Sequence, residues 1–399
     1  MINGVGEAPQ RMFQIRWGPR LNGGTAHQGT SHTLGTPTEG ECNGYRHPNV
    51  CFTYVGDPIR HRVESDARRR FLQTARKSLL AGLALLATVV SANAQDIEWK
   101  RVADSAPWCP RDSGGEVVYK GKMWLLGGWT IGEDRKFHRL NDVWSSPDGI
   151  SWERVSEAAP WPVRNLAGAV VFRDRMWILG GCDGTNSLGD VWSSEDGKNW
   201  TCAATSAPWG PRLAFGCAVF RGKLWVSGGM DLKTMRHTND VWNSEDGVTW
   251  KRVTPEAPWS PRAMFPLVEL DGKLWLFGGG VYDRKSENYH DAWFTGDGAK
   301  WVRAGEDTGW AERRFHIITM YKKKLWLFGG VTDGNVNLND VWSSADGVNW
   351  TIVNKSAPWG VRHEQMCYVY DGALWMLGGF AGDVAGDHLY GDVWRMMMK

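Results

Sequence analysis

The feature of this sequence that most constrains its fold is a Trp-x-x-Gly-Gly motif that occurs six times. Consecutive glycine pairs are 48 to 53 residues apart. The six pairs are Gly127-Gly128, Gly180-Gly181, Gly228-Gly229, Gly278-Gly279, Gly329-Gly330 and Gly378-Gly379. Such a period is typical of proteins built from equal units, each of which buries its hydrophobic face against its neighbours. Six motifs therefore predict six units.

Tryptophan follows the same repeat. Of the 26 Trp in the chain, 24 fall into four sets of six, with one member of each set in every unit. Burial of one Trp side chain removes about 150–250 Å² from water, which is at most about 4–6 kcal/mol. We therefore interpret these 24 as packing residues. Trp17 and Trp129 stand outside the four sets.

Each unit contains four short strand signals separated by Gly, Asp and Asn turns. In the second unit they cover residues 169–172, 176–179, 190–193 and 200–202. Asp-Gly steps such as Asp148-Gly149 suit tight hairpins, because glycine adopts positive φ without a Cβ clash. Four strands at a period near 50 predict an all-β fold, a six-bladed β-propeller with four-stranded blades.

The glycine pair, the loop after it and the spaced aromatic residues resemble kelch repeats over residues 97–399. One difference is Trp144 and its equivalents, which stand where many kelch repeats have Tyr. The last unit ends after Asp392-Val393-Trp394 and lacks a fourth strand, whereas Trp99 precedes the first unit. We therefore expect residues 97–102, the N-terminal strand, to close the sixth blade, because a closed ring leaves few exposed sheet edges.

The first 94 residues have a different character. Arg68-Arg69-Arg70-Phe71-Leu72 resembles the bacterial twin-arginine export motif, a short apolar run follows, and Ala92-Asn93-Ala94 fits a cleavage site. We expect an unstructured prefix at 1–67 with a start codon assigned too early, a signal peptide at 68–94 and a propeller at 95–399. The expected location is periplasmic or secreted.

Charge and cysteine content limit the classes of partner and cofactor that we expect for the mature chain. Residues 1–94 contain 11 of the 46 Lys and Arg but 6 of the 44 Asp and Glu, so residues 95–399 carry a net charge of −3. This charge argues against a nucleic-acid partner. The five mature cysteines show no metal-ligand spacing, and their pairing stays open. We expect no metal, no cofactor, no transmembrane segment in the mature chain, and a monomer.

Strand order places two repeated polar residues on one face, which we call the top. The arginine three residues after the opening Trp of each unit and the aspartate before the third strand both lie there, as in Arg111 and Asp142. The intervening strand ends in glycines, so the arginine could cross it to the carboxylate about 9–10 Å away. Such pairs are our main interpretation, and a ring of six free arginines that binds an anion is the alternative.

Departures from the repeat mark the expected ligand site. After the repeated arginine, blades five, six, one and two carry polar residues, whereas blades three and four carry apolar ones. Trp129 begins the long loop of blade one and could stack on a sugar ring. We therefore expect a small ligand or a protein to bind at the top mouth, through the residues Asp112, Trp129, Arg314, His316, His363 and Glu364.

Three enzyme families offer comparisons. Galactose oxidase has a similar propeller, but its copper chemistry requires His and Tyr ligands, and the mature histidines here are scattered. Sialidases carry an Asp-box that residues 244–250 resemble, but that box is a hairpin brace. N-acetylneuraminate epimerases are six-bladed kelch proteins, and such mutarotation needs an acid–base pair, for which Glu364, His363 and His316 are candidates. We expect a binding or interaction module, with a sugar epimerase or mutarotase as the alternative.

Overall fold

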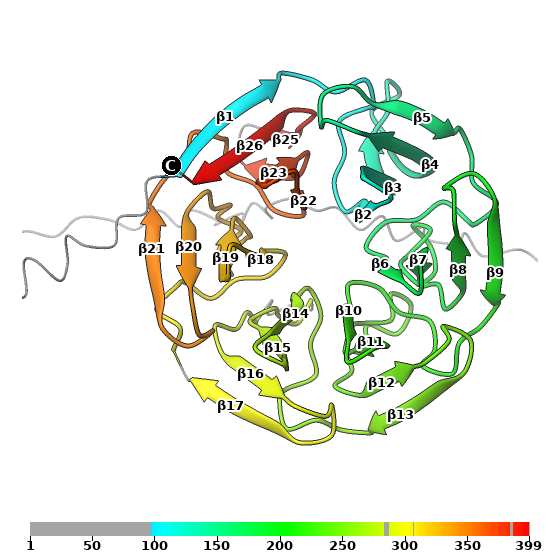
Figure 1. Cartoon of the computed structure of the whole chain (residues 1–399), viewed down its shortest axis with the longest axis vertical. Helices are drawn as coiled ribbons and strands as arrows, with labels where there is room; N and C mark the ends of the chain where they lie inside the picture. Colours follow the sequence, from blue (N-terminus) through cyan, green and yellow to red (C-terminus); the bar gives the residue numbers. More distant parts are fainter. Residues whose placement is uncertain (1–96, 283–286, 306, 384–385, 399) are drawn as a thin grey trace, which may run out of the picture. The chain divides into compact units, whose positions relative to one another are not determined.

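The computed structural model describes residues 97–399, except for 283–286, 306, 384–385 and 399. Every regular element in this part is a β-strand. Six antiparallel four-stranded sheets are arranged around a central axis (Figure 1). The predicted six-bladed β-propeller is therefore confirmed. The predicted prefix at 1–67 and signal peptide at 68–94 lie outside the described residues.

The first three blades follow the chain in order. Blade one consists of β2 (Gly115–Tyr119), β3 (Lys122–Ile131), β4 (Phe137–Ser146) and β5 (Glu153–Ser156). Blade two consists of β6 (Gly168–Phe172), β7 (Arg175–Leu179), β8 (Val191–Ser194) and β9 (Trp200–Ala204). Blade three consists of β10 (Gly216–Phe220), β11 (Lys223–Ser227), β12 (Val241–Ser244) and β13 (Trp250–Thr254). In each blade the first strand lies nearest the axis (Figure 1).

The next two blades repeat this order, and the sixth differs. Blade four consists of β14 (Leu267–Leu270), β15 (Lys273–Phe277), β16 (Ala292–Thr295) and β17 (Trp301–Gly305). Blade five consists of β18 (Ile317–Tyr321), β19 (Lys324–Phe328), β20 (Val341–Ser344) and β21 (Trp350–Asn354). Blade six contains β22 (Met366–Tyr370), β23 (Ala373–Leu377) and β26 (Val393–Met398), with a two-stranded ribbon of β24 (Phe380–Asp383) and β25 (Gly386–Leu389).

The N-terminal strand closes the ring as predicted. β1 (Ile97–Ala103) pairs antiparallel with β26, so the sheet order of blade six is β1-β26-β23-β22. In five blades the opening Trp meets the Trp of the fourth strand edge-on, as Trp108 meets Trp152 at 6.1 Å between ring centroids. In blade six the partner of Trp359 is Trp99, at 5.8 Å. The two ends of the described chain thus complete one blade.

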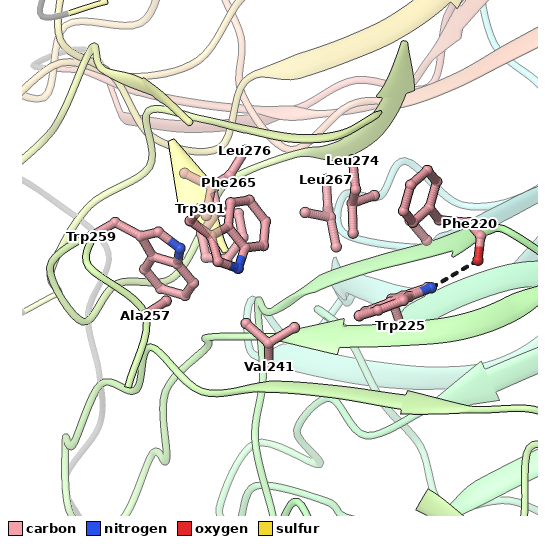
Figure 2. Packing of buried hydrophobic residues seen from close by; sticks show 11 residues of the cluster. Phe220, Trp225, Val241, Ala257, Trp259, Phe265, Leu267, Leu274, Leu276 and Trp301 are labelled. Carbon is pink, nitrogen blue, oxygen red and sulfur yellow. Dashed lines mark hydrogen bonds between the residues drawn. The ribbon is translucent and has the colours of Figure 1, made fainter. Parts of the chain in front are cut away.

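The hydrophobic core is divided into clusters between adjacent blades. Figure 2 shows the cluster between blades three and four, where Trp225 lies near Leu267 and donates its indole N–H to the carbonyl of Phe220 at 2.9 Å. The hairpin of the next blade packs on this Trp. A Cβ on Gly298, at φ +77°, would lie 2.0 Å from the Trp225 ring, so only glycine fits there. The glycine of each Asp-Gly hairpin therefore allows both the tight turn and the close contact with the neighbouring blade.

The Asp-box-like hairpins lie at the bottom of the blades. Asp246 accepts hydrogen bonds from the backbone N–H groups of Val248 at 2.8 Å and Thr249 at 2.7 Å. These donors, acting against the cost of burial, lower the pKa of Asp246 to about 2. The hairpin is a local brace far along the strands from the top mouth. This agrees with its interpretation as a structural feature.

Candidate functional site

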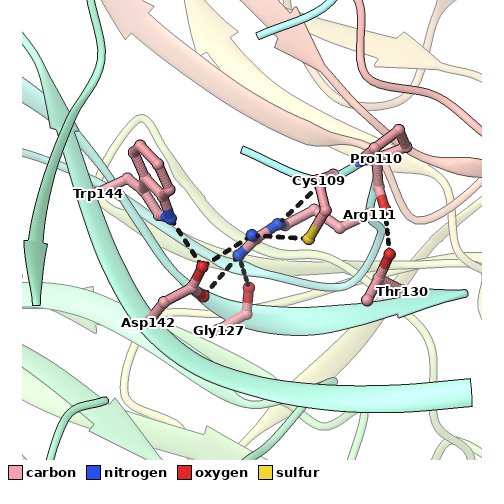
Figure 3. A network of polar contacts seen from close by, with 7 residues as sticks. All are labelled: Cys109, Pro110, Arg111, Gly127, Thr130, Asp142 and Trp144. Carbon is pink, nitrogen blue, oxygen red and sulfur yellow. Dashed lines mark hydrogen bonds and ion pairs between the residues drawn. The ribbon is translucent and has the colours of Figure 1, made fainter. Parts of the chain in front are cut away.

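The repeated arginines are clamped within the fold. Arg111 donates from Nη1 to Asp142 Oδ1 at 2.7 Å and from Nη2 to Oδ2 at 2.8 Å (Figure 3). Nη1 also donates to the carbonyl of Gly127 at 3.0 Å, across the strand end that has no side chain. The equivalent pairs are Arg164–Asp190, Arg212–Asp240, Arg262–Asp291, Arg313–Asp340 and Arg362–Asp392.

All six arginines are buried, which decides between the two interpretations. Each guanidinium group is already neutralised by a bidentate carboxylate, the strongest common form of ion pair in proteins. The predicted Arg–Asp pairs are therefore confirmed. The alternative, a ring of free arginines that binds an anion, is wrong because no charge is left over for a ligand.

The second residue after each arginine forms a closed ring of backbone hydrogen bonds around the axis. We call these residues the mouth ring: Ser113, Leu166, Ala214, Met264, Phe315 and Glu364. Each N–H donates to the mouth-ring carbonyl of the preceding blade at 2.7–3.1 Å, and Ser113 closes the circle on Glu364. All six have φ between +50° and +64°, which is strained for residues other than glycine. The ring fixes their side chains at the top mouth.

Polar side chains of the mouth meet at the seam between blades six and one. Ser113 Oγ lies 2.7 Å from Asp112 Oδ1 and also contacts Glu364 Oε2. A hydroxyl has one hydrogen to donate, so the second contact requires a proton on one of the two carboxyl groups. Burial raises the pKa of Glu364 to about 7, and burial and the charge of Glu364 raise that of Asp112. Burial therefore favours the protonated form of this pair of carboxyl groups.

Two arginines outside the clamps lie near these carboxyl groups. Arg139, in β4, and Arg314, after the clamp of blade five, both act electrostatically on Glu364 and lower its pKa against the larger effect of burial. Arg314 Nη1 donates to Asn288 Oδ1 at 2.9 Å, and its Nε is buried without a partner among the described residues. Arg139 Nε is also buried and unpartnered, and Arg139 forms no ion pair with any described residue.

The two predicted histidines are buried in the walls of the mouth. His363 is 6 % exposed and lies 2.5 Å from Asn337 Oδ1 through Nδ1, and burial lowers its pKa to about 3. His316 stands where blades three and four have Phe215 and Phe265, wedged between blades with its ring 5.5 Å from that of Trp310. Burial lowers the pKa of His316 well below its usual value. Both rings are therefore neutral. His316 packs between blades and also lines the axial opening, and neither of its ring nitrogens has a hydrogen-bond partner among the described residues.

The expectation for Trp129 needs correction. Its backbone pairs with Asp112, and the same pairing occurs in the other blades, so its position belongs to the repeat. The side chain is 5 % exposed, with its ring 5.0 Å from Phe137 and 5.5 Å from Phe380. Phe380 belongs to blade six, so Trp129 packs across the seam. Its covered faces cannot stack on a sugar ring.

The structure thus brings together Asp112, Glu364 and Arg314 of the predicted set and adds Ser113 and Arg139. Ser113 departs from its apolar equivalents by the same criterion that selected Glu364, so the sequence contained its signal. Arg139 lies in the irregular hairpin of blade one, where no repeat defines an expected residue. Among the residues that the structure describes, no group of three or more His, Cys, Asp or Glu side chains could hold a metal ion.

Comparisons with known proteins agree with the fold. A family model described as the KLHDC2/KLHL20/DRC7 Kelch-repeats domain matches residues 87–279. A search of curated proteins found no match. Within the described ranges, no helix is long and apolar enough to cross a membrane.

Proposed function

We propose that this chain, whose repeats and six-bladed ring support the kelch family, is an interaction module that binds a partner polypeptide at the top mouth. A kelch propeller supports a protein-interaction role in general. The position of the binding surface is our own inference. It rests on the contrast between the six arginines in bidentate clamps and the other charged groups of the mouth, among which Arg314 has a single long ion-pair contact, 4.0 Å from Asp333.

One observation carries this proposal. Buried polar atoms in folded proteins almost always have hydrogen-bond partners, and exceptions need an explanation. Around the mouth and the axial opening, the buried atoms that have none among the described residues are Asp112 Oδ2, Arg139 Nε, Arg314 Nε, Gln365 Oε1 and both ring nitrogens of His316. A bound partner with hydrogen-bond donors and acceptors at the mouth would supply the hydrogen bonds that these atoms lack within the fold.

The other half of the mouth favours a ligand with apolar groups as well. Leu166, Ala214, Met264 and Phe315 occupy the mouth ring opposite the polar seam. Buried apolar contact surrounded by a few oriented polar groups is the usual composition of a binding hot spot. A polypeptide with neighbouring charged and apolar side chains fits this arrangement.

Peptides selected from a random library displayed on phage test the proposal. Binding should weaken by about tenfold or more in Glu364→Gln and Arg314→Gln. It should stay within about twofold in two bottom-face controls, the exposed Glu153→Gln and the partly exposed Arg175→Gln. Peptides that bind all four variants equally would place the interaction surface elsewhere on the propeller.

A sugar epimerase or mutarotase is the second candidate, and the raised pKa values of the neighbouring carboxyl groups of Asp112 and Glu364 favour it. Such a reaction needs one group that gives a proton and one that accepts it near neutral pH. Sialic acids and common aldoses would be tested for faster mutarotation, with Glu364→Gln as the inactive control. Catalysis lost in this variant would support the enzyme, and rates equal to buffer would exclude it.

The location remains a proposal as well. The twin-arginine-like segment at 68–72 supports export to the periplasm or beyond. Cell fractionation with the wild-type chain and with a variant in which Arg69 and Arg70 are Lys would test it. Equal distribution of both between the fractions would contradict export by this route.

A further inference from the structure

An axial cavity of about 290 Å³ lies at the centre of the propeller, just below the size range of typical ligand sites. Its upper lining is the mouth ring. Its lower lining includes the fifth residue after each repeated arginine, which we call the inner layer: Glu116, Ala169, Cys217, Leu267, Ile318 and Cys367. The cavity therefore extends from the mouth down between the first strands of the six blades.

Glu116 is the one carboxylic acid of the inner layer. Its carboxyl group forms no ion pair or hydrogen bond with another described side chain. Burial raises its pKa to about 8, against the weaker effect of its own backbone N–H. The titratable groups near Glu116 are Cys367 and Tyr368 of β22. Burial and the charge of Glu116 raise the pKa values of both, so neither supplies a positive charge.

The cavity has two unlike walls. Glu116 on β2, Ser113 above it and Glu364 from blade six make the wall at the seam polar and acidic. Across the axis from β2, β14 contributes Leu267 with Phe265 and Pro266 before it, all apolar (Figure 1). The neighbouring β18 contributes Ile318, with His316 and Thr319 as the polar residues of that blade. A ligand that fits this cavity has an apolar body and a positively charged end.

We propose that the axial cavity is a binding site for an organic ammonium ion, with the ammonium group at Glu116 and the apolar body against β14 and β18. An ammonium group brings three donors and one positive charge to a carboxylate that has no cation of its own. The arginines of the mouth do not replace it, because Arg139 and Arg314 lower the pKa of Glu364, whereas the pKa of Glu116 is set by burial and by its own backbone N–H. This site goes beyond the proposed protein interaction and does not depend on it.

Isothermal titration calorimetry of the full chain with benzylamine tests the site. Benzylamine is a cation at neutral pH, benzyl alcohol is its uncharged counterpart, and benzoate carries the opposite charge. The wild-type chain should bind benzylamine at least about tenfold more tightly than either of the others. Glu116→Gln keeps the shape of the side chain and should lose about tenfold or more in affinity, whereas the exposed control Glu153→Gln should bind as the wild type.

Proton release gives a second measurement that a purely apolar pocket would not produce. At pH 7 the empty site holds Glu116 protonated, and an ammonium ion binds best when this carboxyl is ionised. Titrations in buffers of different ionisation heat should therefore show release of up to about one proton per amine bound. Glu116→Gln lacks this carboxyl group, so it should release fewer protons per amine than the wild type, and the double variant Glu116→Gln/Glu364→Gln separates any release that comes from Glu364.

The two sources of an ammonium group are distinguished by a capped Gly-Lys-Gly peptide. Competition with benzylamine would indicate that a lysine side chain of a partner enters the cavity, and no competition would indicate a free amine; both support the site. Equal binding of benzyl alcohol, tighter binding of benzoate, or unchanged benzylamine affinity in Glu116→Gln would each overturn the proposal. So would the absence of benzylamine binding to a folded wild-type chain.

Discussion

Replacement of Trp99 by Ala tests whether the N-terminal strand holds the ring closed. Trp99 lies in β1 opposite Met396 of β26. Its ring meets Trp359 edge-on at 5.8 Å and Phe328 at 5.7 Å. These contacts join blade six to blade five, and β1 itself joins the two ends of the described chain. Trp152 is the equivalent residue in blade one and supplies a matched control, because it meets Trp108 within a continuous blade.

The expected loss follows from these contacts. A buried Trp replaced by Ala costs about 3–5 kcal/mol, and Trp99 is half-buried, so we expect a loss of about 3 kcal/mol in the free energy of unfolding. Each edge-on aromatic pair accounts for about 0.5–1.5 kcal/mol of this. Deletion of residues 97–103 removes six residue pairs with β26 in addition and exposes its edge, so the ring should no longer unfold cooperatively.

Denaturant unfolding of the full chain and hydrogen exchange measured by mass spectrometry would provide the assay. Trp99→Ala should speed exchange at the amides of β26, whereas Trp152→Ala should speed it in blade one and leave β26 protected. A loss below about 0.5 kcal/mol for Trp99→Ala would be that of an ordinary surface substitution. That result, or a protected β26 after the deletion, would refute the role of β1 in closing the ring.

Three further predictions concern the clamps, the seam and the N-terminus. Arg262→Met should destabilise by about 3–5 kcal/mol because it leaves Asp291 buried and unpaired, and the double variant with Asp291→Leu should recover most of this loss in denaturant unfolding. The pKa of Glu364 is raised in the folded state to about 7, so the native chain binds more protons than the unfolded chain between about pH 4.5 and 7, and stability falls as pH rises through this window. Unfolding of Glu364→Gln across that range should show a smaller fall, and equal slopes would contradict the assignment. N-terminal mass spectrometry of exported protein should find a start at or near Gln95, and peptides from residues 1–60 in that protein would contradict the predicted cleavage.

The architecture could be predicted because each structural requirement recurs in every blade. The same Trp, Arg, Asp and Gly positions occur in six copies. A residue found at one position in every unit therefore reflects a structural requirement and not chance. The ion pair between Arg111 and Asp142 could be predicted from strand order and from the absence of a side chain at Gly127, which lies between them. Closure of the ring could be predicted because the last unit lacks its fourth strand and an additional strand precedes the first unit.

The mouth was only partly predictable, because side-chain direction there is set by contacts between blades. Departure from the repeat selected Asp112 and Glu364, which the structure places at the seam, and Arg314, which lies in the neighbouring blade five. The same criterion also selected His316, which is wedged between blades four and five, and the extra Trp129, which packs on Phe380 of the adjacent blade six. Sequence spacing contains no information on either contact.

The amino-acid sequence by itself thus determined the number of blades, the strands in each, the closure by residues 97–102 and the Arg–Asp clamps, since all of these depend on periodicity and local backbone geometry. Only the tertiary structure decided which polar groups share the axis. Ser113 joins Asp112 to Glu364 because the mouth ring holds its backbone at positive φ beside the last blade. Glu116 faces the axial cavity because ring closure surrounds it with five other first strands, and the cost of leaving its charge unpaired arises only there.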